Sequence, residues 1–128
     1  MAEIKIGNVE ALGKPLGQYS HMTRVKNAQE TLYLAGMLAP GEDFDAQCTG
    51  AFRQIEAALK SAGASWGNVA QFTTYLVHSQ DIAKFMAFRK REFPKLFPDG
   101  KYPPNTLLVI DRLVGEQYLL EVQTVAAL

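Results

Sequence analysis

Two stretches of the chain space their apolar residues at steps of three and four, which predicts two amphipathic helices. The first is expected from about residue 44 to residue 62, and Gly63 directly after it suits a helix end. Its apolar stripe consists of Phe44, Cys48, Phe52, Ile55, Leu59 and Ala62. The second is expected from about residue 81 to residue 93, where Phe85 and Phe88 share one side. Pro94 is expected to close this helix.

Six other segments have the alternating or β-branched apolar residues that are typical of strands. They cover residues 3–7, 19–26, 31–36, 68–77, 106–113 and 117–126. Residues 27–30 suit the turn of a hairpin between the second and third of these strands. The order β-β-β-α-β-α-β-β predicts an α+β fold in a single domain over residues 1–128, with one six-stranded mixed sheet and both helices on one face.

The last two predicted strands are apolar on both of their faces, so both faces need to be covered. Two helices that lie on one face of a sheet leave the other face open. A second copy of the chain is the simplest cover for that face, and the sequence therefore predicts an oligomer.

The composition of the chain argues against several classes of partner and site. Its 128 residues include 13 basic and 13 acidic ones without a block of Lys or Arg, which speaks against a nucleic-acid partner. No run approaches the ~18 apolar residues of a membrane span and no signal peptide opens the chain, so no membrane is expected. The single cysteine, Cys48, fits a cytoplasmic protein. With His21 and His78 it makes too scattered a set for a zinc site, and neither metal nor cofactor is expected.

The stretch YPPNTLLVI, at residues 102–110, places one polar side chain, Asn105, in front of an apolar strand. Pro103 and Pro104 stiffen the approach, because proline fixes the backbone φ angle and removes the N–H group. Asn105 is therefore expected in a rigid backbone segment, at the start of the strand. Its amide has two interpretations: it binds a ligand, or it caps the turn before the strand.

Three stretches are informative together: LYLAGMLAP at residues 32–40, YPPNTLLVIDRL at residues 102–113 and LLEVQTVAAL at residues 119–128. In this order and spacing they resemble the RidA/YjgF/YER057c/UK114 family, or Rid family, over nearly the whole chain. The resemblance implies a chorismate-mutase-like fold and a homotrimer whose sheets form a central barrel. It also implies small-molecule sites in the clefts between subunits. The best-known members hydrolyse reactive enamines and imines, such as 2-aminoacrylate, to a keto acid and ammonia.

The resemblance also implies site residues. The family has an arginine, which grips the substrate carboxylate with two parallel hydrogen bonds, at the position of Asn105. An amide carries no charge, so 2-aminoacrylate is expected to be a poor substrate here. Thr106 and the main chain of Leu107 continue this substrate-binding segment. Tyr19 and Glu121 match family residues near the N-terminal turn and on the last strand, and are the implied catalytic residues.

Two more implied substrate-binding positions depart from the family. The family often has Ser-Gly-Gln where this chain has Ala35, Gly36 and Met37, and an asparagine where Met86 stands. Polar groups of the family pocket are thus replaced by apolar ones, which favours a binding role without catalysis, whereas the presence of Glu121 and Tyr19 favours an enzyme.

Several residues also have plainer interpretations. Glu121 lies between apolar neighbours and would either handle a proton on water or form an ion pair with Arg24 or Arg112. Cys48 lies on the apolar stripe and is expected in the core rather than as a nucleophile. The basic residues at 89–91 are expected on a solvated face of the second helix.

Three functions follow from these residues. The first is a homotrimeric imine or enamine hydrolase that acts on a substrate other than 2-aminoacrylate. The alternative is a trimer without catalytic activity that binds a metabolite or a protein partner. A weaker alternative is an endoribonuclease or translation inhibitor, because some family members have that activity attributed to them. The neutral chain without paired histidines gives this last function little support.

Overall fold

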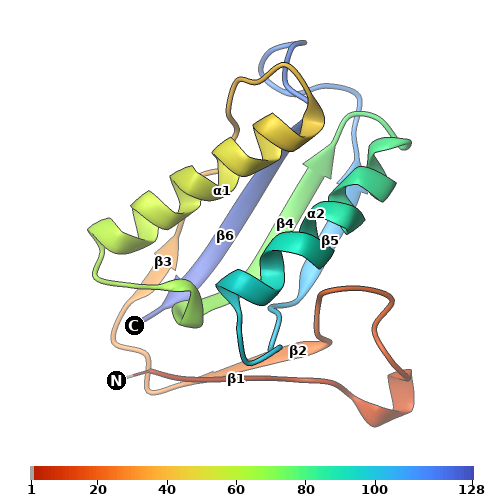
Figure 1. Ribbon diagram of the computed structural model, residues 1–128. Helices are drawn as coiled ribbons and strands as arrows, with labels where there is room; N and C mark the ends of the chain where they lie inside the picture. The colour runs from red at the N-terminus through yellow and green to blue at the C-terminus, as the bar shows by residue number, and fades with distance from the viewer. Residues whose placement is uncertain (1) are drawn as a thin grey trace.

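The computed structural model describes residues 2–128 and has the order of strands and helices that the sequence predicts (Figure 1). Helix α1 spans Phe44–Ser61 and helix α2 spans Asp81–Leu96. The strands are β1 (Glu3–Gly7), β2 (Met22–Lys26), β3 (Thr31–Tyr33), β4 (Val69–Leu76), β5 (Asn105–Val109) and β6 (Leu120–Ala127). Two short 3-10 helices lie at Glu10–Leu12 and Trp66–Asn68. The α+β class is confirmed.

The strands form two sheets, so the expectation of one six-stranded sheet is wrong. Strands β1 and β2 pair only with each other, and the second sheet has the order β3-β6-β4-β5, with β4 and β5 parallel. Strand β2 does lie beside β4, where the Thr23 hydroxyl donates a 2.7 Å hydrogen bond to the Ala70 carbonyl. It does not join that ladder: its contact lies at Ala70, and from Phe72 onward β4 is paired along both edges, with β6 and with β5.

The expected hairpin between β2 and β3 is also wrong, because these strands belong to different sheets. Asn27 takes a positive φ of 57° and turns the chain out of the first sheet. The N–H groups of Gln29 and Glu30 then donate to the Leu128 carbonyl at 2.8 and 3.1 Å. Residues 27–30 therefore connect the two sheets and run beside the C-terminal end of the chain.

Pro94 does not close the second helix, which continues to Leu96. Proline removes one hydrogen bond of the helix ladder, but this one lies in the last turn, where little of the ladder remains to be lost. Phe93 and Phe97, on either side of it, are both buried with ring centroids 5.4 Å apart. Their packing holds the last turn in place.

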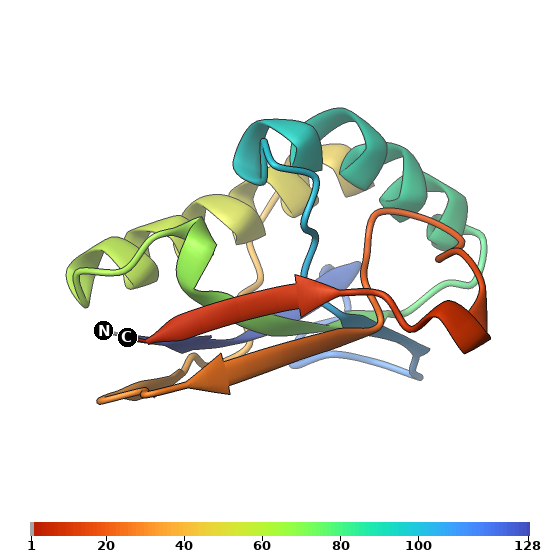
Figure 2. The ribbon, with the colours of Figure 1, turned by 90° about the horizontal axis from the view of Figure 1, so that it is seen from below.

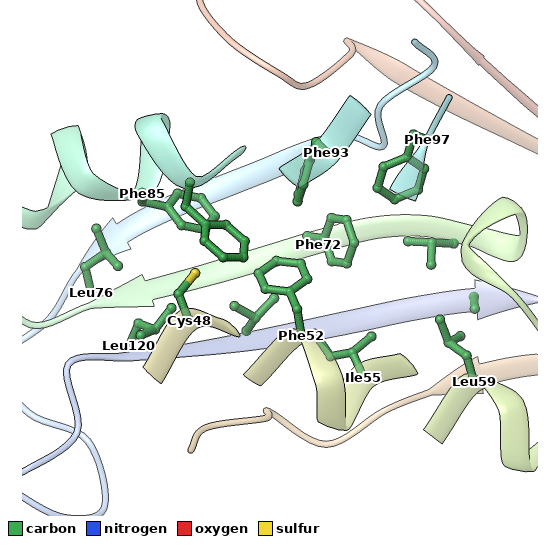
Figure 3. Packing of buried hydrophobic residues seen from close by; sticks show 14 of the residues in the cluster. Cys48, Phe52, Ile55, Leu59, Phe72, Leu76, Phe85, Phe93, Phe97 and Leu120 are labelled. Atoms are coloured by element: carbon green, nitrogen blue, oxygen red, sulfur yellow. The ribbon is translucent and has the colours of Figure 1, made fainter. Parts of the chain in front are cut away.

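An aromatic core fills the space between the helices and the four-stranded sheet (Figure 3). The Phe52 ring of α1 lies at its centre, with centroids 5.3 Å from Phe88 of α2 and 5.7 Å from Phe72 of β4. Cys48 of the same stripe is fully buried, and burial, with a smaller effect of Asp45, raises the pKa of its thiol. The expectation that Cys48 belongs to the core is confirmed.

Both helices cover one face of the four-stranded sheet, as expected, and no helix within residues 2–128 covers the other (Figures 1 and 2). The strand registers place Tyr33, Tyr75, Leu108 and Val125 on this open face. Tyr33 is 77% exposed and Leu108 is 38% exposed. Large apolar side chains therefore face outward from the sheet of an isolated chain, which is the pattern that association of subunits would cover.

Candidate functional site

Glu121 lies on the open face of the sheet. Its neighbours in β6, Leu120 and Val122, are buried against the helices, so the alternation of the strand directs Glu121 the other way. The Glu121 side chain lies against the backbone of Gly36, where an added Cβ atom would come within 2.8 Å of the Glu121 Cγ atom. A glycine is thus needed for this approach. Ala35, the residue before it, belongs to the same stretch beside β6.

The alternative ion pairs of Glu121 are not formed within residues 2–128. Arg112 pairs instead with Glu116, four residues along, at 3.5 Å. Arg24 lies in β2, in register with Lys5 of β1. The half-buried Glu121 carboxylate therefore has no cation of residues 2–128 beside it, which leaves its oxygens available to water or to another molecule.

Asn105 lies at the start of β5, as expected, and its side chain points toward the helix side of the sheet. It is in register with the buried Phe72, and its Oδ1 atom accepts a 2.7 Å hydrogen bond from the Thr74 hydroxyl. Thr74 is itself fully buried, so this hydrogen bond holds the Asn105 amide in a fixed orientation. Asn105 thus bonds across to β4 rather than capping its own turn. Thr106, the next residue, faces the opposite side of the sheet.

The main chain of Leu107 is free for binding, because β5 is an edge strand. Phe72 donates to the Pro104 carbonyl and Ile110 donates to the Leu76 carbonyl, so the even-numbered residues of this segment bond to β4. The N–H and C=O groups of Leu107 then point away from β4, to the open edge. This is the edge at which another molecule can add hydrogen bonds.

Tyr19 lies in the loop between the first 3-10 helix and β2, close to helix α2. Its hydroxyl accepts a 3.2 Å hydrogen bond from the Leu16 N–H group, which closes a tight turn over α2. Within this turn, Gly17 packs against Met86, whose Cε atom lies 2.8 Å from the position of a Cβ atom at residue 17. The guanidinium of Arg89 lies 5.8 Å from the centre of the Tyr19 ring. Tyr19 and Met86 are therefore close neighbours.

The sequence-derived site residues fall into two groups on opposite faces of the sheet. Glu121 lies with Gly36 on the open face, whereas Asn105 projects toward the helix side, the side on which α2 carries Met86. A ligand held by one chain cannot touch both faces of its own sheet. The two groups can meet in one cleft only if they come from different copies of the chain.

One prominent member of this region, the buried Arg89, was not expected from the sequence. It was expected with Lys90 and Arg91 on a solvated face, yet its side chain is only 3% exposed. The helical period contains the missed signal, because position 89 follows Phe85 by four residues and Met86 by three. A charged residue on an apolar stripe is the feature that would have identified it.

The described range, residues 2–128, contains neither a metal-binding cluster nor a membrane-spanning helix. No group of three or more His, Cys, Asp or Glu side chains within that range is arranged to hold a metal ion. None of the helices in the same range is both long and apolar enough to cross a bilayer.

Comparisons with known proteins identify the family and the fold of this chain. The model of the family described as Endoribonuclease L-PSP matches residues 10–128. The chain is similar to YyfB, a Rid-family protein from Yersinia pestis, with a TM-score of 0.83 and 20% identity over 98% of each chain. It is also similar to Rv2704 of the YjgF/YER057c/UK114 family from Mycobacterium tuberculosis, with a TM-score of 0.66 and 22% identity over 98% of this chain and 100% of that one. RidA from an Antarctic Psychrobacter species gives 0.62 and 23%, over 90% and 92%.

Proposed function

The chain belongs to the endoribonuclease L-PSP family, also known as the Rid or YjgF family, and we propose that it is a cytoplasmic homotrimer that hydrolyses an imine or enamine other than 2-aminoacrylate. The observation that carries the proposal is the Glu121 carboxylate, which is half-buried against Gly36 and has no ion-pair partner within residues 2–128. A carboxylate in this setting is suited to move a proton to or from water.

The proposed reaction uses groups from two subunits. Glu121 of one chain accepts a proton from water, whose oxygen attacks the carbon of the C=N bond while the π electrons move to nitrogen. Glu121 passes this proton to the nitrogen, which gives a neutral carbinolamine. It then takes the hydroxyl proton of the carbinolamine and transfers it to the nitrogen as the C–N bond breaks, so that a carbonyl compound and ammonia are released. Asn105 and the free main-chain groups of Leu107, from the neighbouring chain, orient the substrate together with Tyr19. The balance is one imine and one water consumed for one carbonyl compound and one ammonia.

The proposed trimer is supported by the open face of the sheet, where Tyr33 and Leu108 are exposed. Static light scattering of the purified protein at micromolar concentration is expected to give about three times the mass of the chain, because closed cyclic symmetry buries the same face of every subunit. A monomer would contradict the trimer and also the two-chain site that depends on it.

The hydrolase activity is tested by offering the protein a panel of imines generated in situ from amino acids with side chains of different size and charge. Release of ammonia is followed with and without the protein, and at least one imine other than 2-aminoacrylate is expected to be hydrolysed faster with it. If no member of a broad panel is hydrolysed faster, a metabolite-binding trimer without catalytic activity is the better account. The replacement of family polar groups by Ala35 and Met86 already favours that alternative.

The variant Asn105→Arg is expected to improve the binding of small carboxylates and the hydrolysis of 2-aminoacrylate. Hydrogen bonds to a charged group are worth about 1.5–3 kcal/mol against about 1 kcal/mol for neutral ones. Over the two parallel bonds of a guanidinium the difference is about 1–4 kcal/mol, so the gain is about one to two orders of magnitude. Asn105→Gln is the matched control, because it lengthens the side chain without adding charge. Fast hydrolysis of 2-aminoacrylate by the unmodified protein would contradict this explanation.

A further inference from the structure

Arg89 is a buried cation that has no counter-charge within the described range, residues 2–128. Its side chain is only 3% exposed, and its guanidinium lies 4.7 Å from the centre of the Phe85 ring. Burying a charged group without a partner is unfavourable, so proteins normally pair such a group with an acid. Within residues 2–128, no carboxylate forms an ion pair with Arg89; the groups around it are Tyr19, Cys48 and apolar side chains.

The hydrogen bonds of this guanidinium are few and weak. Its Nη1 atom donates to the Gln18 carbonyl over a long 3.4 Å, and Nη2 lies 3.0 Å from the Met86 sulfur, a poor acceptor. The Nε atom has no acceptor at all within residues 2–128. A planar group with five N–H donors is thus held in place with most of its donor capacity unused.

Arg91, two residues later on α2, does have ion-pair partners, so the lack of a partner is particular to Arg89. Arg91 is exposed, yet its Nη2 bonds to Asp45 at 2.6 Å and its Nε to Glu92 at 2.9 Å. These bonds raise the pKa of Arg91, whereas burial lowers the pKa of Arg89. The chain therefore pairs the exposed Arg91, which water could also solvate, and leaves the buried Arg89 without an ion-pair partner within residues 2–128.

Arg89 also lies among residues of the proposed site. Tyr19 and Met86 both contact it, and the Gln18 carbonyl that caps it belongs to the same turn as Tyr19. We infer that Arg89 binds the carboxylate of the ligand and thereby takes over the charge that position 105 lacks. The inference rests on the proposed site. The incoming carboxylate displaces the Met86 sulfur, a poor acceptor, and meets the Nε–Nη2 edge of the guanidinium with two parallel hydrogen bonds.

The position of Arg89 also bears on the class of ligand. A carboxylate held on helix α2 is placed differently, relative to the reacting carbon, from one held at the start of β5. In 2-aminoacrylate the carboxylate is bonded directly to the reacting carbon, and that compound suits position 105. Arg89 lies on α2 instead, so the inference extends to ligands whose carboxylate is separated from the C=N or C=O carbon by further carbon atoms.

The test uses a compound that the protein cannot consume. Binding of 4-oxopentanoate and of its uncharged amide to the assembled protein is measured by calorimetry. The unmodified protein is expected to bind the acid more tightly than the amide. Arg89→Met should weaken binding of the acid at least about tenfold and leave binding of the amide unchanged, because only the charged pair is lost. Arg91→Met, on the same helix, is the matched control and should change neither affinity.

A second measurement detects the contact between ligand and Arg89 in the unmodified protein. In protein labelled with ¹⁵N-arginine, the Nε resonance of Arg89 is assigned as the one that is missing from the spectrum of Arg89→Lys. Addition of 4-oxopentanoate should shift this resonance, and the shift should saturate with the dissociation constant that calorimetry gives. An unshifted resonance during saturable binding would overturn the inference. So would a crystal structure of the assembly in which a carboxylate of the partner subunit occupies the guanidinium. Because binding is measured without turnover, a failure here is distinct from a failure to hydrolyse imines.

Discussion

Glu121→Gln is expected to abolish turnover while leaving the protein assembled and able to bind ligand. An amide has the size and most of the hydrogen-bonding groups of the carboxylate, but it cannot accept the proton of the attacking water. General base catalysis typically contributes about 10²–10⁴-fold, and the loss in kcat on any imine that the protein hydrolyses should lie in this range. The Michaelis constant should change little, since Asn105, Tyr19 and Leu107 are untouched.

Glu116→Gln is the matched control for this variant. Glu116 is a surface glutamate of the β5–β6 connection that pairs with Arg112, and its loss should leave kcat unchanged. Thermal unfolding of both variants separates catalysis from structure. If Glu121 instead forms a buried ion pair with a partner subunit, Glu121→Gln would lower stability by about 3–5 kcal/mol. A variant of unchanged stability and unchanged turnover would remove Glu121 from both roles and favour the binding protein without catalysis.

The helices were the most predictable part of the fold, because their stripes are local features of the sequence. Phe44, Phe52 and Leu59 recur at helical spacing, and all three are buried as predicted. The sheets were less predictable, because the choice of partners is decided over long range. Strand β6 ends the chain, yet it lies between β3 and β4 and leaves β2 without a place in that sheet. No local signal at residues 27–30 distinguishes a hairpin turn from a connection between sheets.

The candidate site could be predicted only in part. The rigid backbone around Asn105 follows from Pro103, Pro104 and the strand after them. The structure places Asn105 at the first residue of β5. Which faces Asn105 and Glu121 point to could not be derived from local sequence, because the register of β5 and β6 against β4 is set by long-range pairing. Arg89 was missed because two adjacent basic residues suggest a solvated patch, although its helical spacing from Phe85 assigns it to the buried side.

The division of the site residues between two faces leads to a second large expected effect. Glu121→Gln and Asn105→Leu, which removes both amide groups of Asn105, should each yield a trimer with little activity. When the two variants are coexpressed with different affinity tags and purified through both tags, every recovered trimer contains both kinds of chain. One of its interfaces then combines an intact Glu121 with an intact Asn105.

This mixed trimer tests the central claim, that each site is built from two chains, most directly. The imine hydrolysis rate of the doubly purified trimers is measured beside an equimolar mixture of the two single-variant trimers. The proposed site predicts about a third of the unmodified activity per trimer, because cyclic symmetry leaves one of three interfaces intact. The unmixed control should stay inactive. If the doubly tagged trimers are as inactive as that control, Glu121 and Asn105 do not act in a shared site and the proposed function is wrong.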